Sequence, residues 1–129
     1  MSVTMTMLAW SVVLGLVHIL LAATFSVARN GLGWALSARD ASKPALDGIG
    51  GRVQRASANF LETFVLFAAA LLAAVAMGRG DAQLALAAQL YFWGRLAYLP
   101  IYALGIPVLR TLAWAVAMVG LVMVLLTLF

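Results

Sequence analysis

The polar residues whose spacing could support chemistry begin a predicted helix at residues 52–77. They are Arg52, Arg55, Asn59 and Glu62. At about 100° of rotation per residue, the four positions fall within an arc of roughly 80° on one helix face. Glu62 lies about 10 Å beyond Arg55 along the helix axis. This stripe could bind a small charged ligand, or Glu62 could form a salt bridge to a neighbouring helix that only stabilises the bundle.

A second polar stripe lies on the predicted helix at residues 81–99 and just beyond its end. It comprises Tyr91, Arg95, Tyr98 and Tyr102. Their offsets of 0, 4, 7 and 11 again indicate one face, although Pro100 interrupts the register before Tyr102. The alternative is an interfacial aromatic belt with an arginine whose head group reaches the membrane surface. That alternative accounts for Tyr102 better than for Arg95, which lies inside the predicted helix on the tyrosine face.

Two further polar residues stand in otherwise apolar helices. Arg110 lies in the first turn of the predicted helix at residues 107–129, one turn before Trp114. It opposes the helix macrodipole there, but it adds to the positive potential with which a helix N-terminus binds anions. The alternative role is an ordinary positive anchor at the membrane surface. His18, in the middle of the predicted helix at residues 3–28, is expected to be neutral and to hydrogen-bond across a helix interface rather than relay protons.

The composition indicates which solvent surrounds these helices. Hydrophobic residues make up 66% of the 129 residues and charged residues only 9%, against roughly 45–50% and about 25% in soluble domains. The net charge is +4, and the basic residues border apolar segments, which favours a membrane surface over nucleic acid as the partner. The absence of cysteine excludes disulfides and thiolate metal ligands. With one histidine and four acids, we expect no metal site.

Four apolar segments are long enough to cross a bilayer as helices: residues 3–28, 52–77, 81–99 and 107–129. Gly78, Arg79 and Gly80 separate the second from the third, Asp81 can cap the third, and Pro107 suits the first turn of the fourth. The last two connections are short, so consecutive helices should be antiparallel. The sequence therefore predicts one domain, residues 1–129, an all-α integral membrane protein with an antiparallel four-helix transmembrane bundle.

The distribution of basic residues predicts the orientation of this bundle. Five of the eight lie between residues 29 and 55, and Arg110 lies on the same side, whereas Arg79 stands alone at the opposite side. By the positive-inside rule, the first and third connections are cytoplasmic and both termini lie on the other face, in the inner membrane if the source is bacterial. The polar stripes then converge at the cytoplasmic end. Four arginines against the single Glu62 suit a small polyanionic ligand rather than a cation.

Three blocks of residues carry a resemblance to a known family. The first is Arg52-Val53-Gln54-Arg55-Ala56-Ser57-Ala58-Asn59-Phe60-Leu61-Glu62, followed by Phe64 and Phe67. The others are Gly94-Arg95-Leu96-Ala97-Tyr98 with Tyr102, and Pro107-Val108-Leu109-Arg110-Thr111. In order and layout, these blocks resemble the MAPEG family of membrane-associated proteins in eicosanoid and glutathione metabolism. The resemblance covers nearly the whole chain.

The resemblance implies a homotrimer that binds glutathione, as co-substrate, between subunits near the cytoplasmic face. The positions that match glutathione contacts are Arg55, Asn59, Glu62, Arg95, Tyr98 and Tyr102. Arg52 is grouped with them as a candidate for holding carboxylates, and Arg110 matches the arginine that stabilises the thiolate in catalytic members. The chain departs from some members at Ala58, Tyr98 and Trp114, so its ligand geometry can differ from theirs.

The function that the resemblance implies is a glutathione-dependent transferase or peroxidase that acts on a hydrophobic electrophile at the bilayer. The first alternative is a non-catalytic membrane protein of the same fold, in which the polar stripes are only structural. The second is a small multidrug exporter. Such an exporter exchanges protons for cations at a carboxylate in its first helix, and residues 3–28 contain no acid.

Overall fold

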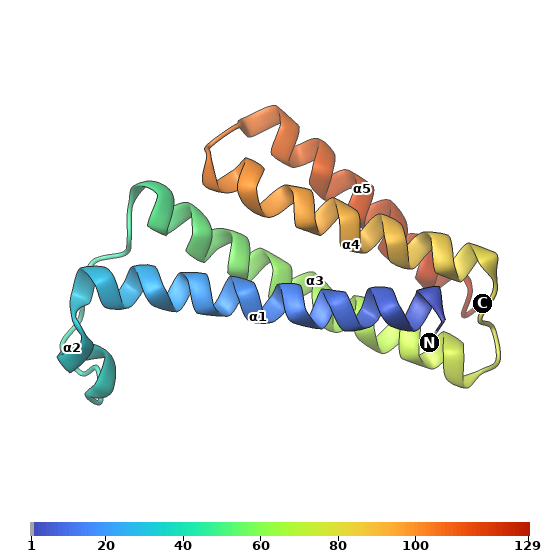
Figure 1. Ribbon diagram of the computed structural model, residues 1–129, viewed down its shortest axis with the longest axis horizontal. Coiled ribbons are helices and arrows are strands. Elements are labelled where there is room, and N and C mark those ends of the chain that lie inside the picture. Colours follow the sequence, from blue (N-terminus) through green and yellow to red (C-terminus); the bar gives the residue numbers. More distant parts are fainter. Residues whose placement is uncertain (1) are drawn as a thin grey trace.

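The computed structural model describes residues 2–129, and these residues form five helices and no strand. The helices are α1 (Val3–Asn30), α2 (Leu32–Leu36), α3 (Gly48–Ala76), α4 (Ala82–Ala103) and α5 (Pro107–Leu126). Figure 1 shows α1, α3, α4 and α5 as long rods side by side, each running opposite to the long helix before it. The short α2 follows the end of α1, within the polar connection between the first two predicted spans.

Helix ends follow local capping chemistry and differ from the predicted ends by a few residues. Asp81 accepts a hydrogen bond from the backbone N–H of Leu84 at 2.9 Å, the predicted cap of α4, and Pro107 occupies the first turn of α5. The sequence placed the start of the second long helix at Arg52, but α3 begins at Gly48. It also ended the third at residue 99, whereas α4 continues through Pro100 to Ala103. A proline inside a helix removes one backbone hydrogen bond, and its ring crowds the carbonyl of the fourth preceding residue. The contacts of α4 with α5 nevertheless continue past Pro100, at Tyr102 and Arg110.

Three of the long helices have the length and hydropathy of membrane spans: α1, α3 and α5. They support the prediction that the chain is a membrane protein. Helix α4 has 22 residues, so its length suffices for a span, but Gln83, Gln89 and Arg95 lower its hydropathy. The role of α4 as the fourth span of a transmembrane bundle therefore stays a prediction.

The core lies where α3 and α4 face each other between α1 and α5. Phe60, Phe67 and Leu71 of α3 are completely buried, as are Leu84 and Tyr91 of α4. The Phe67 and Tyr91 rings stack with their centres 3.9 Å apart. The Tyr91 hydroxyl lies 3.0 Å from the Thr63 hydroxyl, so this buried polar group has a partner. These contacts fix the register of α3 against α4, and this register positions the polar stripes.

Two glycines bring α4 and α5 into close contact. A Cβ atom on Gly94 would lie 2.8 Å from the backbone nitrogen of Ala117. A Cβ on Gly120 would lie 2.6 Å from the backbone oxygen of Ala87 and 2.7 Å from the backbone nitrogen of Tyr91. The obstructing atoms belong to backbone and cannot rotate away. Small residues at such contacts are the usual means by which membrane helices approach closely.

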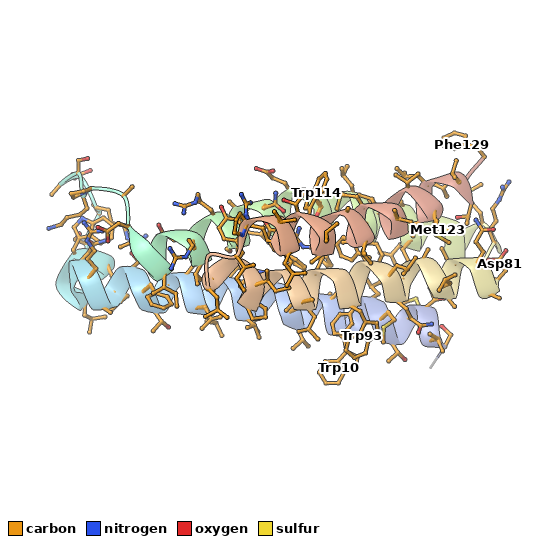
Figure 2. The ribbon with its side chains drawn as sticks, turned by 90° about the horizontal axis from the view of Figure 1, so that it is seen from above. Trp10, Asp81, Trp93, Trp114, Met123 and Phe129 are labelled. Carbon is orange, nitrogen blue, oxygen red and sulfur yellow. The ribbon has the colours of Figure 1, made fainter. Side chains whose placement is uncertain are left out.

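Figure 2 shows the side chains that project from these helices. The exposed rings of Trp10 and Trp93 project from the same edge of the molecule, whereas Trp114 and Met123 lie along α5, away from them. The α1–α4 side and the α5 side are therefore separate apolar surfaces.

We predict that Gly120→Ala destabilises the protein by about 1–3 kcal/mol, because the added methyl group overpacks a backbone contact. The measurement is the thermal unfolding midpoint in a mild detergent. Gly80→Ala is the matched control, since nothing lies within 4 Å of a Cβ at Gly80. Equal midpoints for the two variants would contradict the close packing of α4 on α5.

Candidate functional site

The side chain of Arg95 is the most deeply buried charge of the chain. It is completely buried, and its Nη1 donates a hydrogen bond to Oδ1 of Asn59 at 2.6 Å. The guanidinium carbon lies 4.2 Å from the ring centre of Tyr98 and 5.4 Å from that of Phe60. Arg95 is therefore not an interfacial arginine that reaches the membrane surface. The predicted stripes of α3 and α4 meet at this contact.

Tyr102 gathers side chains from three helices beside this contact. Its hydroxyl accepts a hydrogen bond from Nε of Arg55 at 3.1 Å. The guanidinium carbon of Arg110 lies 4.7 Å from the Tyr102 ring centre, within cation–π distance. The rings of Tyr98 and Tyr102 pack edge to face at 5.3 Å. Pro100 does not remove Tyr102 from the stripe, because α4 stays helical past the proline.

A small pocket of about 170 Å³ opens between these side chains. Its lining residues are Asn59, Tyr98, Arg110, Thr111 and Trp114. Thr111 and Trp114 were not in the predicted set of site residues. Both had a signal in the sequence, since Thr111 ends the third block of the family resemblance and Trp114 is a position at which the chain departs from some members.

An apolar groove of about 330 Å³ continues from this pocket along α5. It is lined by Trp114, Ala115, Met118, Val119, Val122 and Met123. Trp114 is common to both, so the charged pocket and the apolar surface share one wall. Figure 2 shows Trp114 and Met123 at the two ends of this stretch of α5.

Two predicted site residues lie apart from the pocket. Arg52 donates from its Nε to the backbone oxygen of Ala103 at 2.9 Å, and so it holds the end of α4 against α3. Glu62 is exposed at the middle of α3. Within residues 2–129 the one ion pair joins Arg29 to Asp47, at 3.7 Å. The alternative in which Glu62 forms a salt bridge to a neighbouring helix of its own chain is therefore wrong.

His18 is completely buried and stacks on Phe60, with ring centres 4.6 Å apart. Gly15 permits the contact, since its Cβ would lie 3.0 Å from Cε1 of Phe60. The hydrogen bond of His18 was expected across a helix interface. Instead Nδ1 bonds the backbone oxygen of Leu14 in the same helix, at 2.8 Å. Polar side chains in a helix can bond the backbone oxygen of the fourth preceding residue in this way.

The site therefore combines a surplus of positive charge with aromatic surface. Arg55 and Arg110 converge on Tyr102, and Arg95 lies behind Asn59 in the pocket wall. In the part of the chain that the structure describes, Nε and Nη2 of Arg95 have no hydrogen-bond partner. Guanidinium groups recognise carboxylates and stabilise anions, and they do so more strongly away from water. Chemically, the arrangement suits an anionic ligand.

Comparison with known proteins gives one finding. The model of the MAPEG family matches residues 7–129, nearly the whole chain. No curated protein and no solved structure gives a significant match. The chain belongs to the MAPEG family.

We predict that Asn59→Ala lowers the free energy of unfolding by about 1–3 kcal/mol or more, because it removes the hydrogen-bond acceptor of a buried guanidinium. The thermal unfolding midpoint without ligand measures this effect. Gln54→Ala is the matched control, because Gln54 lies on the same helix and makes no side-chain hydrogen bond within residues 2–129. Unfolding midpoints that do not differ between the variants would mean that the buried hydrogen bond does not contribute to stability.

Proposed function

We propose that this member of the MAPEG family is a glutathione-dependent transferase or peroxidase. The observation that carries the proposal is the convergence of Arg55 and Arg110 on Tyr102, beside a pocket that Asn59 and Tyr98 line. Glutathione carries two carboxylates, one ammonium group and a thiol. A cluster of arginines with one accessible carboxylate complements this set of charges.

The binding roles follow from where each side chain lies. Arg55 has two guanidinium nitrogens besides the one bonded to Tyr102, and two nitrogens of Arg95, Nε and Nη2, have no hydrogen-bond partner within residues 2–129. We assign these groups, together with Arg52, to the carboxylates of the co-substrate. Glu62 is assigned to its ammonium group, since it is an exposed carboxylate without a cationic partner in its own chain.

Arg110 is assigned to the reacting sulfur. A thiol has a pKa of about 8.5, so only a few per cent is ionised at neutral pH. A guanidinium nearby favours the thiolate, and lowering that pKa by about two makes most of the bound thiol ionised at pH 7. The thiol proton leaves to water, and the sulfur then attacks the electrophile and forms a thioether as the leaving group departs. Arginine suits the role because it stays charged beside other cations.

The electrophile is proposed to be hydrophobic and to arrive from the bilayer. The apolar groove on α5 and the charged pocket share Trp114. An apolar molecule in the groove would lie beside Arg110, where the sulfur is proposed to bind.

We further propose that the chain works as a homotrimer with its ligand sites between subunits. A pocket of about 170 Å³ is smaller than the roughly 300–1,000 Å³ of ordinary small-molecule sites, so a single copy provides only part of a site. Glu62 lies on a face with the exposed apolar residues Leu61, Val65 and Leu66. A carboxylate on such a face in a membrane is costly unless another chain or a ligand covers it. In this assembly α4 would be the fourth transmembrane helix.

The alternative is a non-catalytic member of the family whose arginines only stabilise the bundle. The Arg52–Ala103 and Arg95–Asn59 hydrogen bonds are compatible with it. Arg110 favours the catalytic proposal, because its side chain lines the pocket and its guanidinium lies over the Tyr102 ring.

We predict that the purified protein is stabilised by glutathione and conjugates it to a generic aryl halide. Arg110→Ala should still bind glutathione but lose most of the thiolate absorbance in the ultraviolet and most of the conjugation rate. Arg55→Ala should mainly weaken binding. Arg39→Ala is the matched control, since Arg39 is exposed and lies far from the pocket in the connection between α1 and α3.

The outcomes separate the alternatives. Thermal stabilisation without conjugation would favour a non-catalytic member, and no stabilisation at all would contradict the glutathione site. An unchanged pH dependence of the thiolate absorbance in Arg110→Ala would remove Arg110 from the mechanism. Thr111 would then be the next candidate.

We predict that Glu62→Gln weakens glutathione binding and lowers the stability of the assembly, because the substitution keeps the shape but removes the charge. Isothermal titration measures the binding, and native mass spectrometry in a mild detergent measures the trimer. Unchanged affinity and unchanged stability would together contradict the pairing of Glu62. A spectrum with monomers alone for the unsubstituted protein would count against the trimer.

A further inference from the structure

The connection between α1 and α3 contains a small ordered unit, which we call the α2 lobe (residues 32–43). The indole nitrogen of Trp34 donates to the backbone oxygen of Ala41 at 2.9 Å. Arg39 folds back so that Nε and Nη2 donate to the backbone oxygen of Ala35, at 3.2 and 3.1 Å. Its guanidinium carbon lies 5.1 Å from the ring centre of Trp34. The α2 lobe therefore has a defined local conformation.

This ordered unit has no core of its own. None of the residues of α2 is buried. Leu32 and Leu36 are 61% and 78% exposed, and their spacing of four residues places them on one face of the helix. Among the helices, α2 contacts α1 and no other. Leucine side chains that a defined conformation holds in water contribute no hydrophobic stabilisation, because their apolar surface stays exposed. They contribute it only if something outside the chain covers them.

The position of the α2 lobe indicates what covers it. Helix α1 is a candidate membrane span of 28 residues, or about 42 Å, close to the roughly 40–45 Å thickness of a bilayer with its head groups. Helix α2 begins two residues after α1 ends. Figure 1 shows it turned out of the line of α1 and away from α4 and α5. A lobe in this place lies at the level of the lipid head groups, beside the bundle.

The composition of the lobe matches that level of the membrane. Tryptophan is enriched where head groups meet acyl chains, and helices that lie on a membrane present leucines on one face and basic residues beside them. Arg39 and Lys43 are the basic residues of the lobe, and Asp40 is its one acid. Arg52 and Arg55 add positive charge at the same end of the molecule, where Arg29 is paired with Asp47. That end therefore complements anionic lipid head groups.

We propose that the α2 lobe is an interfacial membrane anchor. Leu32 and Leu36 insert among the acyl chains just below the head groups, and Trp34 lies at the boundary. Arg39 and Lys43 contact lipid phosphates. The anchor holds the connection between α1 and α3 flat on the membrane surface, and it needs neither a ligand nor catalysis for this role.

The absence of cysteine makes the anchor directly testable, because one introduced cysteine is unique. Leu36→Cys and, as matched control, Asp40→Cys each receive a nitroxide spin label in the full-length protein. The proteins are placed in bilayer nanodiscs of phosphatidylcholine with and without phosphatidylglycerol. Oxygen concentrates among the acyl chains, whereas a water-soluble nickel complex stays in the water. The collision rates of these two reagents with the label therefore report how deep the label lies in the bilayer.

We expect the label at position 36 to collide more with oxygen than with the nickel complex, and the label at position 40 to show the reverse order. Phosphatidylglycerol should increase the difference, and Lys43→Gln in the Leu36→Cys background should remove that increase. A label at position 36 that is immobile and shielded from both reagents would show that a second copy of the chain covers the lobe. A label that collides mainly with the nickel complex would show that the lobe stays in water. Either result overturns the proposal.

Discussion

The contact on which the site depends is the hydrogen bond between Arg95 and Asn59. A fully buried guanidinium is costly in a membrane protein unless its surroundings compensate it. Asn59 supplies one acceptor, and the faces of Tyr98 and Phe60 supply π-electron density. These contacts tie α3 to α4. The same residues, Asn59 and Tyr98, line the pocket, so the interaction that stabilises the buried charge also shapes the surface on which chemistry is proposed.

The sequence predicted the parts of this arrangement that follow from periodicity. The spacing of Arg55, Asn59 and Glu62 indicated one face of a helix, and α3 is continuous through all three. The cap at Asp81 and the start at Pro107 follow from local chemistry and are confirmed. The third span was predicted to run to about residue 99, with Pro100 bending or ending the helix, whereas α4 continues to Ala103. Packing between α4 and α5 keeps the helix going, and such packing is not visible in a local pattern.

Other features depend on which surfaces meet and could not be predicted from one chain. The hydrogen bond of His18 was predicted across a helix interface, whereas Nδ1 bonds the backbone oxygen of Leu14 in the same helix, because the fold decides which groups face the imidazole. Helix α2 has five residues, too few for a periodic signal, and its geometry comes from the contacts of Trp34 and Arg39. Glu62 is exposed and forms no ion pair within residues 2–129, so the partner proposed for it lies outside the single chain. Membership of the MAPEG family explains why the three blocks of polar residues occur together.

The glycine contacts between α4 and α5 have a consequence for movement. With backbone against backbone at Gly94 and Gly120, neither helix can slide along the other without a clash, so the two behave as one rigid body. Arg110 and Tyr98 therefore keep their relative positions when the molecule flexes. Widening of the pocket requires α3 to move relative to this rigid pair, and the Arg95–Asn59 hydrogen bond crosses that boundary. The freedom of the pocket to admit a larger ligand is thus set by how readily one buried hydrogen bond lengthens.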